Sequence, residues 1–149
     1  MVMITCTQKR RMKVKVKKLH KDAVIPKYAN PGDAGLDLTA VSHKPHGDGI
    51  DFQEYGTGLA FEIPKGYVGL LFPRSSITTK QMMLKNSVGV IDSVFRGEVK
   101  LRFIGTDDYK VGDRVGQLII IPYPEIELEE VEELEDSVRG TGGYGSTGN

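Results

Sequence analysis

The chain has 149 residues, with twenty basic and twenty acidic side chains and a formal net charge of zero. A neutral chain lacks the long-range attraction that binding to polyanions uses, so we expect no nucleic-acid partner. No apolar run approaches the ~20 residues of a membrane span, and the first residues lack the order of a secretory signal. We therefore expect no membrane partner and a cytoplasmic (intracellular) location. Cys6 is the only cysteine, which excludes an intrachain disulfide.

The N-terminal part is basic. In KVKVK at residues 13–17, lysine and valine alternate with the period of two that indicates a strand with one solvated face. One arrangement pairs this strand with the acidic residues 125–136, and the alternative interpretation is a nucleic-acid arm. We assign residues 1–12 to an N-terminal extension.

Short β-type runs separated by glycine and proline fill most of the remaining chain. This pattern predicts an all-β barrel or sandwich in a single domain. One short helix is expected over residues 75–83, and residues 42–49 are expected to be a polar loop in which His43 and His46 are solvated. The predicted strands cover residues 36–41, 58–63, 67–72, 88–91, 99–104, 115–121 and 126–131.

Three internal segments carry polar groups next to predicted strands. The sequence PRSS at residues 73–76 precedes the predicted helix, and it is either an ordinary helix cap or an anion site built from backbone N–H groups and Arg74. Asp92 lies at a predicted hairpin between residues 88–91 and 99–104. Gln117 lies at the start of an apolar strand, after the turn at residues 112–114. Taken singly, each has an ordinary structural explanation.

The C-terminal sequence RGTGGYGSTGN, residues 139–149, combines glycines with one arginine and one aromatic ring. Glycine permits close backbone approach to a ligand, Arg139 suits phosphate oxygens, and Tyr144 offers a stacking face. Ser146 and Thr147 add hydroxyl donors. The segment is either a clamp for a nucleoside phosphate or a flexible tail.

In this order and spacing, these segments and AGLDLTA at residues 34–40 resemble the five motifs of the trimeric deoxyuridine triphosphatase (dUTPase) family. The resemblance extends from about residue 13 to residue 149. It implies a distorted jelly-roll β-barrel over residues 13–138 that assembles as a homotrimer. It also implies a C-terminal arm, residues 139–149, that is exchanged between subunits and closes over the nucleotide.

The same resemblance implies hydrolysis of dUTP to dUMP and pyrophosphate, which keeps uracil out of DNA and supplies dUMP for thymidylate synthesis. Asp92 would orient water for attack on the α-phosphorus and contact the 3′-hydroxyl of the sugar. The implied cofactor is Mg²⁺, which prefers phosphate oxygens and water, so we expect no direct protein ligand. Asp37 either contacts the metal through water or is a structural polar group.

By resemblance, the substrate contacts fall into three groups. The deoxyribose packs on Phe95, where the family usually has tyrosine, and Tyr144 takes the place of the usual phenylalanine over the base. A narrow site around uracil excludes the methyl group of thymine, and cytosine presents the reversed hydrogen-bond pattern. The phosphates are assigned to Arg74, Ser75, Ser76, Gln117, Arg139, Gly145, Ser146 and Thr147, and uracil to Asn86, Gly89, Val90 and Ile91.

Two alternatives differ in class. A dCTP deaminase shares the fold, but its catalytic glutamate aligns with Arg102, which cannot act as a base. A catalytically silent nucleotide sensor would not need Asp92, Gln117 and the complete arm together. Both alternatives predict no release of pyrophosphate from dUTP.

Overall fold

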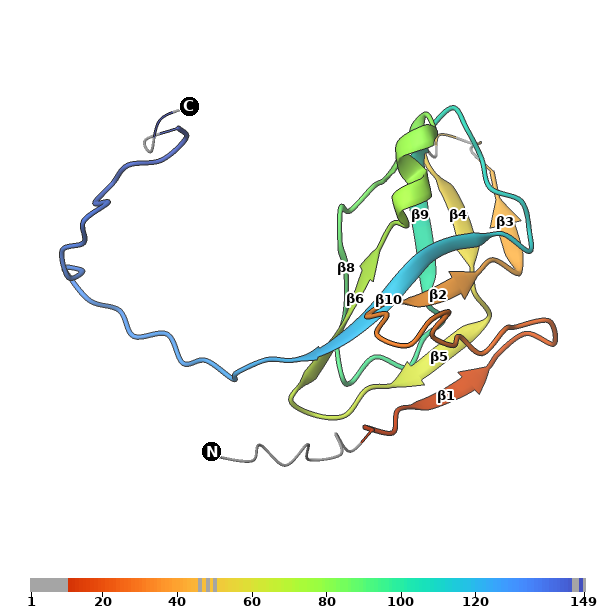
Figure 1. Ribbon diagram of the computed structural model, residues 1–149, viewed down its shortest axis with the longest axis horizontal. Coiled ribbons are helices and arrows are strands. Elements are labelled where there is room, and N and C mark those ends of the chain that lie inside the picture. Colours follow the sequence, from red (N-terminus) through yellow and green to blue (C-terminus); the bar gives the residue numbers. More distant parts are fainter. Residues whose placement is uncertain (1–10, 46, 48, 50, 146–147, 149) are drawn as a thin grey trace, which may run out of the picture.

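The structure is a computed structural model in which residues 11–45, 47, 49, 51–145 and 148 are described. These residues form β-strands and one short 3-10 helix, so the prediction of an all-β fold is confirmed (Figure 1). None of them forms a helix that is long and apolar enough to cross a membrane. In chain order the elements are β1 (Lys15–Lys18), β2 (Leu36–Thr39), β3 (Ser42–Lys44), β4 (Gln53–Gly56), β5 (Leu59–Glu62), β6 (Tyr67–Phe72), η1 (Ser75–Thr79), β7 (Met82–Leu84), β8 (Gly89–Ile91), β9 (Lys100–Gly105) and β10 (Arg114–Pro122).

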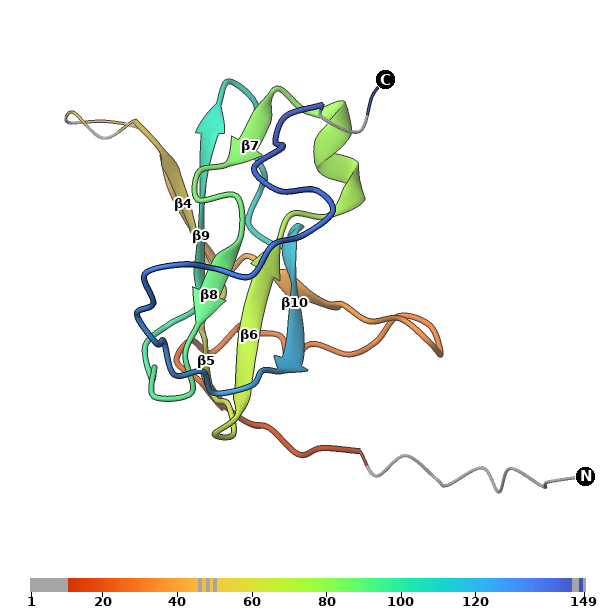
Figure 2. The ribbon, with the colours of Figure 1, turned by 90° about the vertical axis from the view of Figure 1, so that its left-hand side faces the viewer.

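The strands form two four-stranded sheets and one two-stranded sheet, all with antiparallel pairing. One sheet has the order β2-β10-β6-β8, the second has the order β3-β4-β9-β7, and β1 pairs with β5. Figure 2 shows β6 and β10 on one side of the barrel and β4 and β9 on the other. The side chains between them form one core, in which Leu38, Tyr55, Leu59, Phe103, Val115 and Leu118 are 0% exposed.

Strand β10 lies between β2 and β6, and its register positions polar side chains. Gln117 is opposite Asp37 on β2 and opposite Phe72 on β6. Cross-strand partners point to the same face of a sheet, so Gln117 and Asp37 share one face. The far edge of β6 pairs with β8, where Leu71 is opposite Gly89. One sheet therefore carries four of the five motif segments in its strands or directly after them.

The helix predicted over residues 75–83 is wrong in length and type. Only Ser75–Thr79 is helical, as a 3-10 helix, and the Thr78 and Thr79 hydroxyls donate to the carbonyls of Ser75 and Ser76. The chain then becomes strand β7, because Met82 and Leu84 bury their side chains against the core while pairing with β9. Tertiary pairing thus overrides the helical pattern.

The hairpin predicted around Asp92 is also wrong. Strand β8 pairs with β6, whereas β9 pairs with β4 and β7 in the other four-stranded sheet. Residues 92–99 therefore cross from one sheet to the other instead of folding back on β8. The reason is that each run finds its hydrogen-bonding partner in a different part of the chain.

At the chain ends, the pairing differs from the expected one. Strand β1 pairs with β5, with Lys15 opposite Glu62, and not with the acidic residues 125–136. No strand forms at residues 126–131, where Ile126 is 73% and Leu128 is 87% exposed. The segment pairs with none of the sheet edges in the described residues, so its alternating apolar side chains stay uncovered. In Figure 1 the chain after β10 extends away from the barrel.

The expected polar loop at residues 42–49 instead begins with strand β3. The ring of His43 stacks on Tyr55 with centroids 4.6 Å apart, and its Nε2 lies 2.9 Å from Gln53 Oε1. His43 is therefore half-buried rather than solvated, because β4 supplies a ring and an amide to it. His46 lies outside the described residues.

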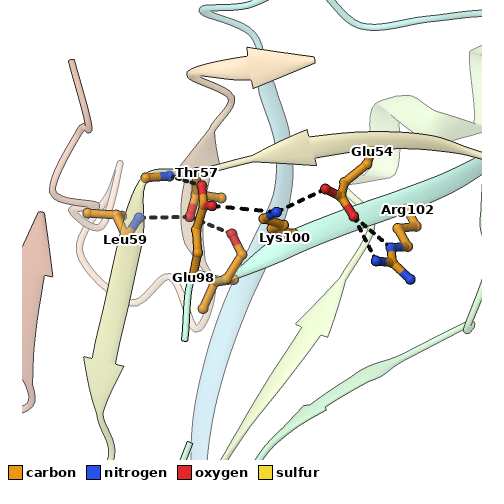
Figure 3. Close-up of polar contacts among 8 residues, drawn as sticks. Glu54, Thr57, Leu59, Glu98, Lys100 and Arg102 are labelled. Carbon is orange, nitrogen blue, oxygen red and sulfur yellow. Dashed lines mark hydrogen bonds and ion pairs between the residues drawn. The ribbon is translucent and has the colours of Figure 1, made fainter. Parts of the chain in front are cut away.

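A chain of alternating charges joins β4 and β9 (Figure 3). Glu54 accepts hydrogen bonds from Lys100 Nζ at 3.0 Å and from Arg102 Nε at 2.8 Å. Burial alone would raise the pKa of Glu54, but these two cations hold the pKa below its ordinary value of 4.5. Glu98 lies 3.7 Å from Lys100 and accepts from the Gly58 N–H at 2.8 Å, which extends the chain to β5.

Replacing Glu54 with glutamine should lower the free energy of unfolding at neutral pH by roughly 0.5–1 kcal/mol, since both cations remain partly exposed. Because the folded pKa is depressed, this contribution is present above pH 4.5 and is lost as the pH falls through the folded pKa. Urea denaturation of the wild type and E54Q at pH 7 and pH 3 measures the effect. The difference between the two proteins should shrink at pH 3, and an equal difference at both values would contradict the ion-pair origin.

Candidate active site

A pocket lies beside strand β8, and we call it the β8 pocket. Its volume is about 450 Å³, which is in the usual range for small-molecule sites. It brings together five of the residues predicted to hold the nucleoside, without Tyr144. The lining residues are Leu71, Lys85, Asn86, Gly89, Val90, Ile91, Phe95, Glu98, Val99, Lys100 and Arg102.

A tight turn between β7 and β8 shapes the mouth of the β8 pocket. Ser87 has a φ of 60°, which is uncommon for a residue other than glycine. Its N–H donates to the Leu84 carbonyl at 3.1 Å, and the Val88 N–H donates to the Asn86 carbonyl at 2.6 Å. The turn thus fixes the backbone of residues 86–89 at the pocket.

The Phe95 ring lies close to the backbone of Gly97. A Cβ atom added at Gly97 would lie 2.6 Å from the Phe95 ring, so only glycine leaves room for the ring in this position. The Phe95 N–H donates to the Asp92 carbonyl at 3.1 Å, which closes the turn after β8. The ring is 43% exposed and forms part of the pocket wall.

Four charged residues that line the β8 pocket were not predicted as site residues from the sequence. Lys85, Glu98, Lys100 and Arg102 line it. Lys100 and Arg102 alternate with the buried Leu101 and Phe103 along β9, so the period-two pattern of this strand was the available signal. The hydrogen bond to Glu54 raises the pKa of Lys100 and keeps its ammonium charged beside the pocket.

The second pocket lies beside the N-terminal half of β10, and we call it the β10 pocket. Its volume is about 320 Å³. It brings together three residues that were predicted to hold phosphates, and Asp37 adjoins them. The lining residues are Ala29, Asp33, Ala34, Gly35, Asp37, Arg74, Ser75, Gln117 and Ile119.

One carboxylate joins two arginines at the β10 pocket. Asp37 Oδ1 accepts from Arg74 Nε at 3.0 Å, and Oδ2 accepts from Arg114 at 3.0 Å. Asp37 and Arg74 are each about one quarter exposed, so water screens their attraction only in part. The cluster has two cations and one anion. Asp37 thus fixes the Arg74 side chain at the pocket, where Asp33 adds a second carboxylate to the lining.

Gln117 is positioned by its contacts with two neighbouring segments. Its Nε2 donates to the Pro73 carbonyl at 3.0 Å, which ties β10 to the residues before η1. A Cβ atom added at Gly35 would lie 2.2 Å from Gln117 Oε1. The glycine in the AGLDL sequence therefore leaves the space that the Gln117 amide occupies.

Several predicted residues line neither pocket. Asp92 is exposed directly after β8, and Ser76 is exposed on η1. In the arm, Arg139 Nε donates to the Gly142 carbonyl at 2.7 Å, and Tyr144 is fully exposed together with its neighbour Gly145. Ser146 and Thr147 lie outside the described residues.

The part of the chain that the structure describes holds no cluster of three His, Cys, Asp or Glu side chains that could bind a metal ion. Both oxygens of Asp37 are already bonded to arginines. A metal held here would therefore take most of its ligands from a bound substrate and from water.

The chain is similar to known proteins over nearly its full length. A family model described as dUTPase matches residues 21–148. The deoxyuridine 5′-triphosphate nucleotidohydrolase of Corynebacterium glutamicum is 42% identical over 141 residues, which cover 91% of this chain and 94% of the relative. The protein of the same name from Nautilia profundicola is 42% identical over 142 residues, which cover 92% of this chain and 99% of the relative.

Solved structures support the same relationship. The dUTPase of Staphylococcus bacteriophage 80alpha, solved with dUpNHpp, is 27% identical with a TM-score of 0.77, covering 92% of this chain and 99% of that chain. A variant of the dUTPase from phage phi11 of S. aureus, described with a structural Mg(II) ion, is 25% identical with a TM-score of 0.69, covering 84% of this chain and 100% of that chain. Since the family model matches most of the chain and the bacterial relatives are about 40% identical, the chain belongs to the dUTPase family.

Proposed function

We propose that this protein hydrolyses dUTP to dUMP and pyrophosphate. The observation that carries the proposal is the family membership over almost the whole chain, with relatives named deoxyuridine 5′-triphosphate nucleotidohydrolase. The two pockets fit the two halves of such a substrate. One offers a backbone turn and an aromatic ring, and the other offers a guanidinium, a hydroxyl and an amide.

The nucleoside half binds in the β8 pocket. Backbone groups of residues 86–91 and the Asn86 side chain read the edge of uracil, and the Phe95 ring packs against the deoxyribose. A tight turn leaves little room for the methyl group of thymine, and cytosine would leave buried polar groups unpaired. Tyr144 from an arm stacks on the base.

The triphosphate half binds at the β10 pocket. Arg74, Ser75, Ser76 and Gln117 supply donors, and none of these side chains carries a negative charge that would repel phosphate. Asp37 holds Arg74 at 3.0 Å, so the guanidinium is oriented before the substrate arrives. The arm adds its donors when it closes: Arg139, Gly145, Ser146 and Thr147.

The complete site is shared between subunits of a homotrimer. Within one chain the β8 pocket and the β10 pocket have no lining residue in common, and the described arm residues line neither pocket. The single chain also exposes large apolar side chains: Val90 is 65% exposed and Val94 is 82% exposed. Such groups are typical of an assembly interface. The β8 pocket of one chain and the β10 pocket of another chain together hold the substrate. The arm then closes over the substrate and completes the site.

Asp92 orients the attacking water. An aspartate is ionised at neutral pH and accepts a hydrogen bond from water. The oriented water attacks the α-phosphorus, the bond from that phosphorus to the bridging oxygen of the β-phosphate breaks, and pyrophosphate leaves. No described side chain bonds to the Asp92 carboxylate, so it is available to water and to the 3′-hydroxyl.

Mg²⁺ is the proposed cofactor, and it neutralises charge on the triphosphate. The described residues offer no cluster of metal-ligating side chains, and Asp37 is occupied by two arginines, so a bound Mg²⁺ would rely on phosphate oxygens and water for its ligands. Asp37 would contact such an ion only through water. In the cytoplasm, the reaction would keep uracil out of DNA and supply dUMP for thymidylate synthesis.

Deamination of dCTP is not favoured. The position of the deaminase glutamate is Arg102, which donates to Glu54 at 2.8 Å and cannot accept a proton.

Turnover of dUTP tests the proposed activity and the role of Asp92. Pyrophosphate release by the wild type should be fast with dUTP and slow with dCTP and UTP. Asp92→Asn keeps the size but removes the charge, so kcat should fall by at least ~10² while dUpNHpp still binds. A stopped assay of pyrophosphate release measures kcat, and isothermal titration calorimetry measures the binding of dUpNHpp. Near-normal turnover in the variant would exclude Asp92 from the mechanism, and a wild type that releases no pyrophosphate would reject the function.

Gly35→Ala tests the contact that positions Gln117. The new Cβ would lie 2.2 Å from Gln117 Oε1, so the amide must move and lose its bond to the Pro73 carbonyl. Since the displaced atom ends a flexible side chain, Tm should change little, whereas KM for dUTP should rise roughly 3- to 10-fold. Gly47→Ala is the matched control, because nothing lies within 4 Å of its added Cβ. Equal kinetics for both variants would argue against the role of Gly35.

The arm is expected to act on a neighbouring subunit. Ordering a glycine-rich segment costs about 1–2 kcal/mol per residue, which ligand contacts can offset. A chain ending at Val138 should still form trimers but lose most activity. Mixing this shortened chain with full-length Asp92→Asn by co-refolding should restore activity, because some sites then combine a working Asp92 with an arm from another chain. Inactive mixed trimers, verified by native mass spectrometry, would show that the arm does not act between subunits.

A further inference from the structure

Tyr109 lies in the loop between β9 and β10 and is buried behind η1. Only 4% of its surface is exposed. Its ring packs edge-on against Tyr55 and Phe103, with centroids 5.8 Å and 5.5 Å away. Its backbone N–H donates to the Tyr55 hydroxyl at 2.9 Å. The ring is therefore fixed by the core, and the direction of the hydroxyl is fixed with it.

The Tyr109 hydroxyl differs from that of its neighbour. Among the described residues, it is the one buried side-chain polar atom without a hydrogen-bond partner. The Tyr55 hydroxyl, in the same aromatic cluster, donates to Gln53 Oε1 at 2.9 Å and accepts from the Tyr109 N–H. Buried hydroxyls are almost always bonded, because an unmade bond is costly in the interior. The unpaired hydroxyl of Tyr109 thus requires an explanation.

The groups around this hydroxyl belong to the phosphate-binding segment. Burial raises the pKa of Tyr109, and the nearby Arg74 charge and Ser76 hydroxyl offset part of that rise. The Ser76 hydroxyl therefore lies close to the Tyr109 hydroxyl without completing a hydrogen bond to it. Arg74 and Ser75 line the β10 pocket on the other side of this segment.

The rest of η1 is already tied to the Tyr109 loop. Lys80 Nζ donates to the Asp108 carbonyl at 2.9 Å and lies 4.8 Å from the centre of the Tyr109 ring. The Gln81 N–H donates to Asp107 Oδ2 at 2.7 Å. Figure 1 shows η1 beside the loop that follows β9. The C-terminal side of η1 is thus anchored by several contacts.

The N-terminal side of η1 is held only through the residues before the helix. Gln117 bonds to the Pro73 carbonyl, and Asp37 bonds to Arg74. Arg74 makes no side-chain capping bond, and Ser75 and Ser76 in the first turn are exposed. A bond from Tyr109 to Ser76 is therefore the contact that the fold leaves open in this turn.

We propose that Tyr109 is a positioning residue for triphosphate binding, whose hydroxyl donates to Ser76 Oγ when phosphate contacts draw the first turn of η1 into place. The proposal rests on the proposed function, because it assigns the phosphates to Arg74, Ser75 and Ser76. Binding of the triphosphate completes the hydrogen bond that is unmade in the free chain. Part of the affinity for the triphosphate therefore comes from the protein interior.

The test compares Tyr109→Phe with Tyr55→Phe in the full-length trimer, with dUpNHpp and dUMP as probes. Tyr109→Phe should weaken dUpNHpp binding and raise KM for dUTP roughly 3- to 10-fold, with kcat nearly unchanged. Its affinity for dUMP should stay at the wild-type value, and its Tm without nucleotide should stay the same or rise, since the variant removes an unpaired buried hydroxyl and no bond of the free protein. Tyr55→Phe removes two existing bonds, so it should lower Tm and leave the ratio of the dUpNHpp and dUMP affinities unchanged.

A second variant tests the partner. Ser76→Ala should weaken dUpNHpp binding, and adding Tyr109→Phe to it should cause no further loss, because the two groups share one bond. Additive losses in the double variant, or wild-type dUpNHpp affinity in Tyr109→Phe, would overturn the proposal while leaving dUTP hydrolysis intact. A wild type that does not hydrolyse dUTP would instead reject the proposed function and the inference with it.

Discussion

The pairing of β10 with both β2 and β6 is the constraint on which the rest of the structure depends. It puts Gln117 opposite Asp37 and Phe72, so the AGLDL segment, the residues before η1 and the start of β10 meet at one place. A shift of one residue would turn Gln117 toward the core and Leu118 outward. Leu118 is 0% exposed, so burial of its side chain holds the register that the polar cluster needs.

The two pockets differ in the groups that they offer more than in their net charge. At the β10 pocket, Arg74 and Arg114 share Asp37, and Asp33 adds a second carboxylate to the lining. At the β8 pocket, Lys100 and Arg102 are paired with Glu54 and Glu98, and the backbone turn at Asn86 adjoins the Phe95 ring. The oriented Arg74 guanidinium at one pocket and the turn with its aromatic ring at the other are consistent with a substrate that has a polyanionic end and a neutral base.

The two pockets also explain why one chain is an incomplete enzyme in our proposal. They lie at opposite edges of the β10–β6 pair, because β8 adjoins β6 on one side and β2 adjoins β10 on the other. After β10 the chain extends away from the barrel (Figure 1), and the described arm residues line neither pocket. Assembly of subunits then explains both the separation of the two pockets within one chain and the exposure of large apolar side chains on its surface.

Sequence alone determined the all-β class, most strand positions and the family, because alternating burial and the motif residues are local properties that a single segment displays. It also singled out some residues of each pocket, such as Asn86, Arg74 and Gln117, but not the charged residues of the β8 pocket. Tertiary structure decided the partners: β1 with β5, β7 in place of the second half of a helix, and β8 and β9 in different sheets. Which strands pair depends on all the strand edges that are available in the folded chain. A local sequence pattern does not contain that information. For the same reason, the unpaired hydroxyl of Tyr109 behind Ser76 became visible only when the loop after β9 was packed against η1.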